Sequence, residues 1–177
     1  GSVLGLFGST FVAAKEIAVA IVVLGLGSTS ANALNIIGLS PVSQSAEEGS
    51  DFAIDIFMDF DEVTIGGGFE VTFDSSELTF LTFRFDQNFT ANFGLTGPDP
   101  GSVAPALESS FGWLIFTGIR GETGTHTVGQ LVFRANGPGS VQIVMAEESN
   151  GNAGPYYGPA NLNSPMNVEF GSATINV

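Results

Sequence analysis

Few side chains in this sequence could support catalysis. The single histidine, His126, lies in the turn-like segment GETGTHT before an expected strand, and any serine-histidine-aspartate site would have to use it. No Gly-x-Ser-x-Gly elbow or other nucleophile context accompanies it, which favours an exposed histidine at a strand edge. The absence of cysteine excludes thiol catalysis and cysteine-ligated zinc. We therefore expect a protein that is not an enzyme.

Carboxylates are numerous, and a pair of them could hydrolyse a glycosidic bond. Asp51, Asp55 and Asp59 fall on one face of a predicted strand, where neighbours lie about 13 Å apart at the usual rise per residue. That distance exceeds the separation in retaining and in inverting glycosidases. A solvated acidic face is the favoured interpretation, and a carboxylate pair formed across two strands stays open.

Two segments are dense in the oxygen ligands that calcium prefers. The first is Asp59-Phe60-Asp61-Glu62, and the second runs from Glu147 to Asn152. Neither matches the EF-hand pattern. Ligand type alone therefore predicts a structural calcium ion, and no other cofactor, at Asp59, Asp61, Glu62, Glu147, Glu148 and Asn150.

Exposed aromatic rings are the usual contacts for sugars, because a flat ring stacks on the apolar face of a pyranose. Trp113 lies in an alternating pattern and is expected in the core. Tyr156 and Tyr157, within the loop sequence GPYYGP, are difficult to bury together, so both are predicted ligand contacts. Tyrosine is also enriched at protein interfaces, so these residues do not distinguish a polysaccharide from a protein partner.

Charge restricts the partners further. The 177 residues carry 18 acidic and 4 basic side chains, for a net charge of −14. Such a surface repels phosphate backbones and anionic lipid headgroups, so no nucleic-acid partner is expected. An acidic chain with very little lysine also suits a salty or calcium-containing exterior.

The first 33 residues have the pattern of an export signal. An apolar run over Ile17–Leu26 follows Lys15, and Ala31-Asn32-Ala33 provides an A-x-A cleavage site. We predict a signal peptide cleaved after Ala33, membrane contact only during export, and a secreted product that is extracellular or at the cell surface. The alternative is a retained apolar helix within residues 11–26, which is short for a membrane span but could pack between the subunits of a filament.

Residues 34–177 are predicted to form one all-β domain. Apolar and polar residues alternate strictly over 51–60, which predicts a half-buried strand with an acidic outer face. Similar runs follow, separated by turns rich in glycine, proline, asparagine and aspartate. A change of phase predicts a β-bulge near Phe80. The turn Asn136–Gly139 predicts a hairpin between a strand ending at Ala135 and a partner beginning at Val141. About eight short strands without an amphipathic helix favour a two-sheet sandwich.

The order of these segments resembles the cohesin-like modules of bacterial exported proteins, which are relatives of carbohydrate-binding sandwiches. The matching stretches are PVSQSAEEGSDFAIDIFMDF at 41–60, FEVTFDSSELTF at 69–80 and VGQLVFRANGPGSVQI at 128–143. The resemblance implies a jelly-roll β-sandwich of about eight or nine strands, used for protein-protein or surface attachment. Such modules often precede a sorting tail with a Pro-Glu-Pro motif, whereas this sequence ends at Val177 without one, so anchoring by that route is not expected.

The favoured hypothesis is a non-catalytic extracellular interaction module that binds a protein, or a second copy of itself, through a sheet face or a strand edge. One alternative is a carbohydrate-binding module that contacts a polysaccharide through Tyr156 and Tyr157. The other is a self-assembling extracellular filament subunit that retains its N-terminal apolar helix.

Overall fold

A computed structural model describes residues 33–89, 91, 93–96, 106–115, 118–148 and 155–177. The chain divides into two units, Gly1–Ala31 and Asn32–Val177, and the described residues belong to the second. The predicted signal peptide and the alternative apolar helix therefore lie outside the described residues, apart from Ala33. Within the described ranges every regular element is a strand, and no helix is long and apolar enough to cross a membrane.

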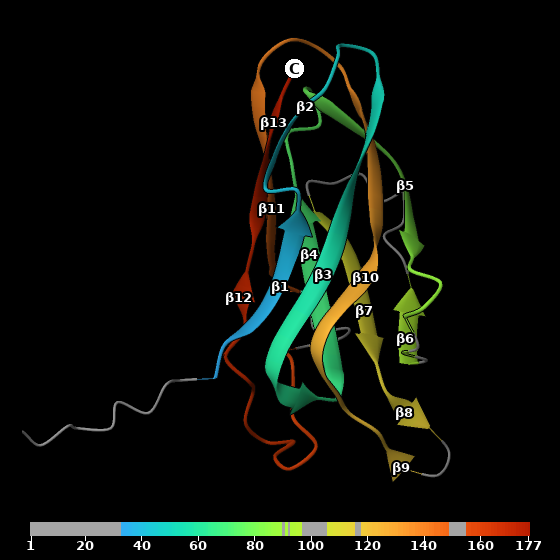
Figure 1. Cartoon of the computed structure of the whole chain (residues 1–177), viewed down its shortest axis with the longest axis vertical. Helices are drawn as coiled ribbons and strands as arrows, with labels where there is room; N and C mark the ends of the chain where they lie inside the picture. The colour runs from blue at the N-terminus through green and yellow to red at the C-terminus, as the bar shows by residue number, and fades with distance from the viewer. Residues whose placement is uncertain (1–32, 90, 92, 97–105, 116–117, 149–154) are drawn as a thin grey trace, which may run out of the picture. The chain divides into compact units, whose positions relative to one another are not determined.

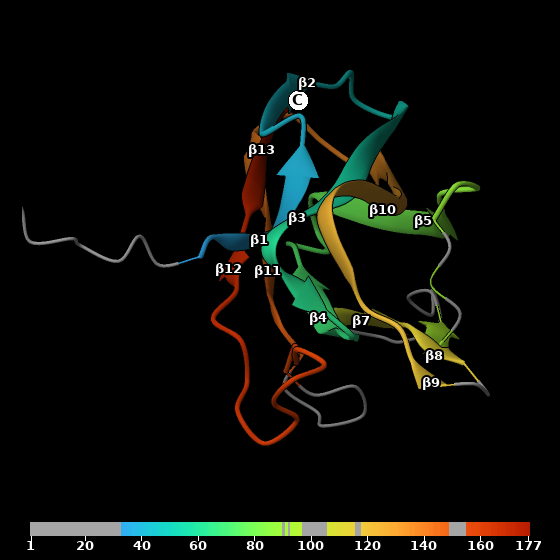
Figure 2. The ribbon, with the colours of Figure 1, turned by 60° about the horizontal axis from the view of Figure 1, so that its bottom comes forward.

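Two β-sheets form the domain, and Figures 1 and 2 show them as separate layers. Sheet A has the strand order β12-β1-β3-β10-β5, and sheet B has the order β2-β13-β11-β4-β7-β6. The strands of sheet A are β1 (Asn35–Ser40), β3 (Asp51–Thr64), β5 (Leu78–Phe85), β10 (Glu122–Ala135) and β12 (Glu169–Phe170). Those of sheet B are β2 (Ser43–Ser45), β4 (Gly66–Thr72), β6 (Phe93–Thr96), β7 (Ala106–Gly112), β11 (Ser140–Glu147) and β13 (Ser172–Asn176).

A separate two-stranded ribbon is made by β8 (Leu114–Ile115) and β9 (Gly118–Ile119). The described residues thus form 13 strand segments, and the predicted all-β sandwich is confirmed. The number exceeds the expected eight or nine because β2, β8, β9 and β12 have only two or three residues each. Segments that short carry no alternation from which a strand can be predicted.

The apolar alternation of β3 builds the centre of the core. Ile54, Ile56 and Met58 are completely buried, whereas Asp51 and Asp59 on the opposite face are exposed. Burying an aliphatic side chain of this size stabilises the fold by about 1.5–3 kcal/mol. The predicted half-buried strand with an acidic outer face is therefore confirmed.

The predicted bulge in β5 is also confirmed. Phe80 lies opposite Phe133 and Thr82 opposite Val132, so Leu81 is an extra residue without a partner on β10. The insertion shifts the phase of the strand, and both Phe80 and Phe83 consequently face the core side of sheet A. Their neighbours Phe133 and Leu131 are fully buried.

The predicted hairpin between β10 and β11 is wrong, because β10 belongs to sheet A and β11 to sheet B. The turn between them is bonded to other segments. Asn136 donates its backbone N–H to the carbonyl oxygen of Glu77, just before β5, at 2.8 Å, and Gly139 exchanges two backbone hydrogen bonds with Val177. These bonds hold the turn across the end of the sandwich, so that the connection crosses from one sheet to the other.

The first and last strands of the domain pair in parallel in both sheets. β1 pairs with β12 in sheet A, and β2 pairs with β13 in sheet B. The chain changes sheet at the cis Ser40–Pro41 bond and again at Gly171. A Cβ atom added to Gly171 would lie 3.1 Å from the Cα of Gly38, so the backbones approach closely at the second change.

Three successive glycines, Gly66 to Gly68, begin β4 and lie within the sheet. All three are buried, and the ring of Tyr156 lies directly over Gly67. A Cβ atom added to Gly67 would lie 2.6 Å from Cγ of Tyr156, which is too close for any contact between carbon atoms. The glycine therefore provides the space in which the tyrosine ring is buried.

We predict that Gly67→Ala destabilises the domain by about 1–3 kcal/mol, because the new methyl group overpacks a buried ring. Gly137→Ala is the matched control, since a Cβ atom there would meet no atom within 4 Å. Urea unfolding of both variants measures the difference. Equal midpoints for the two variants would contradict the packing of Tyr156 on Gly67.

Candidate interaction surface

The outer face of sheet A carries an acidic stripe that is hydrogen bonded within the sheet. Three aspartates of β3 each accept a hydrogen bond from the residue opposite them on β10. The pairs are Asp51 with Arg134 (2.7 and 3.1 Å), Asp55 with Gln130 (2.8 Å) and Asp59 with Thr125 (2.7 Å). The hydrogen bond and charge of Arg134 lower the pKa of Asp51. None of the three therefore faces another carboxylate on β10, as a glycosidase pair across these strands would require.

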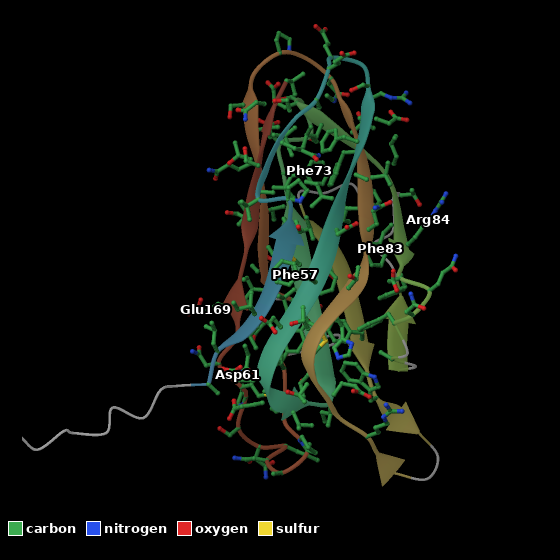
Figure 3. All side chains as sticks on the ribbon, in the orientation of Figure 1. Phe57, Asp61, Phe73, Phe83, Arg84 and Glu169 are labelled. Atoms are coloured by element: carbon green, nitrogen blue, oxygen red, sulfur yellow. The ribbon has the colours of Figure 1, made fainter. Side chains whose placement is uncertain are left out.

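An aromatic ring interrupts this stripe. Phe57 lies on the same face between Asp55 and Asp59, and its side chain packs over Gly38 of β1 (Figure 3). The ring is half-buried there. The ring is therefore covered in part by β1, and the aspartates on either side of it are engaged across the strands.

The outer face of sheet B has a different character. Val144, on the central strand β11, is 39% exposed and lies opposite Thr72 on β4. The next outward pair is Ala146 and Glu70, and Glu70 in turn lies opposite Glu108 on β7. This face thus combines an exposed aliphatic side chain with two carboxylates at facing positions.

The structure places the two predicted tyrosine contacts differently. Tyr156 is completely buried, with its ring centroid 5.5 Å from that of Phe60, 5.7 Å from Phe111 and 6.3 Å from Phe170. The prediction that it contacts a ligand at the surface is wrong, because the glycine run of β4 makes room for its ring. Tyr157 is half-buried, and its role as a ligand contact stays a prediction.

The aromatic cluster around Tyr156 contains two buried polar atoms. Trp113 is 3% exposed, as expected for a core residue, and its ring packs against Phe111 at 5.6 Å. Neither Nε1 of Trp113 nor the hydroxyl of Tyr156 has a hydrogen-bond partner among the described residues. A buried hydroxyl without a partner costs stability relative to the same ring without the oxygen.

The first predicted calcium segment is the end of strand β3 and not a loop. Asp61 accepts a hydrogen bond from the backbone N–H of Leu34 at 2.9 Å, and Glu62 accepts one from the side chain of Asn35 at 3.1 Å. Asp59 is bonded to β10, so the three carboxylates have separate partners. Among the described residues no three acidic, histidine or cysteine side chains form a group that could hold a metal ion.

The second predicted calcium segment is described only in part. Glu147 is exposed at the end of β11, Glu148 is 5% exposed, and Asn150 lies outside the described residues. A calcium ion at this segment stays a prediction.

His126 lies inside β10, so the expected turn at GETGTHT is wrong. The pairing of β10 with β5 ends at Gly129, and His126 therefore occupies a part of β10 that is paired with β3 alone. Its ring is half-buried, with Nε2 3.0 Å from the carbonyl oxygen of Thr123.

Neither protein-family models nor curated proteins match the sequence. Solved structures do match the fold. The third cohesin of ScaC from Acetivibrio cellulolyticus, in complex with the ScaB dockerin, superimposes with a TM-score of 0.60 at 12% identity, over 81% of this chain and 99% of that one. A type I cohesin-dockerin complex from Clostridium thermocellum gives a TM-score of 0.59, with the same identity and coverage. The seventh ScaB type I cohesin from Pseudobacteroides cellulosolvens gives 0.57 at 12% identity, over 81% and 93%.

The domain has a cohesin-like fold. The resemblance read from residues 41–60, 69–80 and 128–143 is confirmed at the level of the fold, and with it the jelly-roll β-sandwich. At 12% identity the likeness extends to the arrangement of strands and leaves the partner of this cohesin-like domain to be argued from its own surface.

We predict that Tyr156→Phe makes the domain less sensitive to alkali. Burial, and secondarily the charge of Glu147, raise the pKa of Tyr156 well above its usual 10.0. The folded state therefore favours the neutral phenol. The stability of the domain is therefore fully present below pH 10.0, where the phenol is neutral in both states. Above pH 10.0 the unfolded chain loses this proton more readily than the folded one, so stability falls as the pH rises towards the raised pKa. Phenylalanine has no proton to lose, so the variant keeps its stability.

Urea unfolding at about pH 8 and about pH 11 measures this difference. At the lower pH, Tyr156→Phe is expected to be as stable as the parent or more stable by about 1 kcal/mol, because it removes a buried hydroxyl without a described partner. Tyr157→Phe, at the neighbouring half-buried position, is the control and should keep the alkaline loss of the parent. A parental loss in Tyr156→Phe would contradict the assignment.

Proposed function

We propose that the cohesin-like domain is a non-catalytic module that binds a protein partner outside the cell. The observation that carries the proposal is the fold, because two of the structures that share it were solved with a bound dockerin. The surface chemistry agrees with this function: Asp51, Asp55 and Asp59 of β3 are hydrogen bonded to β10, and His126 lies against a backbone carbonyl. The extracellular setting rests on the A-x-A pattern before Leu34.

The outer face of sheet B supports a binding role better than the outer face of sheet A. Sheet A uses Arg134, Gln130 and Thr125 to satisfy the acidic stripe of its own strand β3. A partner docking there would have to compete with these hydrogen bonds. On sheet B, Val144 offers a large exposed aliphatic side chain near the middle of the sheet. Apolar anchors surrounded by polar groups are typical of the centres of protein interfaces.

The charge of sheet B also indicates the chemistry of the partner. Glu70 lies beside Ala146 and opposite Glu108, one residue pair along from Val144 on the same face. A protein that presents an apolar side chain to Val144 and a basic surface to this acidic domain would match this face. The net charge of −14 would assist the approach of such a basic partner at low ionic strength.

We predict that Val144→Arg weakens binding of the partner at least about tenfold, equivalent to about 1.4 kcal/mol, because a charged side chain replaces an apolar anchor. The probes are a panel of purified dockerins and secreted proteins of the host retained on the immobilised domain, with and without calcium. Each interaction is quantified by biolayer interferometry.

Val132→Arg is the matched control, since Val132 lies on the outer face of β10, an inner strand of sheet A. This variant should bind as the parent does. Equal loss in both variants, or loss only in Val132→Arg, would argue against sheet B as the interface. A domain that retains neither a dockerin nor any secreted protein would refute the protein-binding function.

The position of the mature N-terminus separates the module from the filament alternative. We expect the intact mass of the protein from its native host to correspond to a chain that begins at Leu34, because signal peptidase cleaves after the A-x-A pattern. A mass that includes residues 11–33 would instead favour assembly through a retained apolar helix.

A further inference from the structure

A cleft of about 550 Å³ lies where β3 ends. One wall is the pair Glu62 and Val63, and the other is the segment 158–167, which forms part of the orange-red loop beyond the end of β3 in Figure 1. Every residue that lines this cleft belongs to the described part of the chain. The volume falls within the range of sites for small molecules, about 300–1,000 Å³.

The side chain of Asn35 joins the two walls. Asn35 is 1% exposed, and its amide nitrogen donates one hydrogen bond to Oε2 of Glu62 and another to the carbonyl oxygen of Asn167, both at 3.1 Å. Its amide oxygen accepts the backbone N–H of Glu62, also at 3.1 Å. A single buried side chain thus fixes the spacing between the end of β3 and the far end of the loop.

The near end of the loop is fixed independently. The carbonyl oxygen of Tyr157 accepts hydrogen bonds from the hydroxyl of Thr64 at 3.1 Å and from the backbone N–H of Ile65 at 2.8 Å. Tyr156, the preceding residue, is anchored in the core, and its carbonyl oxygen accepts the backbone N–H of Met166 at 2.8 Å. The cleft is therefore formed before any ligand binds, which reduces the entropy cost of binding.

The lining combines hydrogen-bonding and apolar groups. Its polar side chains are one carboxylate, two amides and a hydroxyl, from Glu62, Asn161, Asn167 and Ser164. Val63, 43% exposed, and Met166 supply apolar surface. A single carboxylate is a poor site for a divalent cation, and an anion would be repelled by that carboxylate and by the net charge of −14.

We propose that this cleft binds a neutral saccharide. Vicinal hydroxyls of a sugar can donate to the carboxylate of Glu62 and exchange hydrogen bonds with the asparagine side chains, while the C–H faces of the ring contact Val63 and Met166. None of the residues that line the cleft is aromatic, so hydrogen bonds rather than ring stacking carry the affinity. The cleft is separate from Val144 on the outer face of sheet B, so a saccharide and a protein partner can be tested independently.

The experiment is affinity electrophoresis of residues 34–177 in gels containing soluble β-glucan, xylan, galactomannan or no polysaccharide. At least one neutral polysaccharide is expected to retard the domain, and Glu62→Gln is expected to weaken the interaction at least about tenfold, since it removes a charge-assisted hydrogen bond while keeping the shape of the side chain. Glu47→Gln, an exposed glutamate outside the cleft, removes the same charge and should migrate in parallel with the parent.

Titration of the same domain with an oligosaccharide of the retarding polymer, followed by amide chemical shifts, locates the site. Changes at residues 62–63 and 158–167 that are absent in Glu62→Gln would support the proposal. Unretarded migration in every gel, equal retardation of both variants, or shifts centred on another surface would overturn it. Retention of cationic peptides in place of saccharides in this cleft would overturn it as well.

Discussion

Parallel pairing of the first and last strands holds the two sheets of this domain together. Each terminal segment of the domain contributes to both sheets, because β1 and β12 lie in sheet A, whereas the strands that follow them, β2 and β13, lie in sheet B. The sequence has no cysteine, and only two ion pairs are found among the described residues, so packing and backbone hydrogen bonding carry the stability. The core between the layers depends on this closure, since β3 and β11 bury their apolar faces only while both sheets stay aligned.

Local patterns in the sequence predicted the parts of the fold that local forces decide. The alternation of β3 and the bulge at Leu81 follow from the period of the side chains. Turn chemistry is equally local: before β5, Ser76 donates two hydrogen bonds to the carboxylate of Asp74, which lower the pKa of that carboxyl. The crossing from β10 to β11 could not be predicted, because the turn at Asn136 is held by Glu77 and Val177, which lie far away in the sequence. The resemblance to cohesin-like modules was informative because a known fold includes the long-range strand pairings that local patterns do not reveal.

The residues of the candidate sites also divide between those placed by local forces and those placed by long-range contacts. Tyr156 was expected at the surface because two adjacent tyrosines in a loop are difficult to bury together, yet a glycine some ninety positions earlier makes room for its ring. Asn35 gave no signal in the sequence, since its importance arises only where the end of β3 meets the loop before β12. The two outer faces also differ for reasons of register. The outward residues Asp51, Asp55 and Asp59 of β3 face side chains of β10 that can donate hydrogen bonds, whereas the outward residue Val144 of β11 faces Thr72 of β4.

The direction of the terminal strands has a mechanical consequence. β1 and β13 run the same way, so residues 34 and 177 lie at opposite ends of the sandwich (Figure 1). Tension applied between those two residues would act along the strands and at right angles to the hydrogen bonds that join β1 to β12 and β2 to β13. Such a load shears all the bonds of a ladder together, whereas a pull from one end would open them one after another. A load carried between residues 34 and 177 would therefore act along the more resistant direction of the fold.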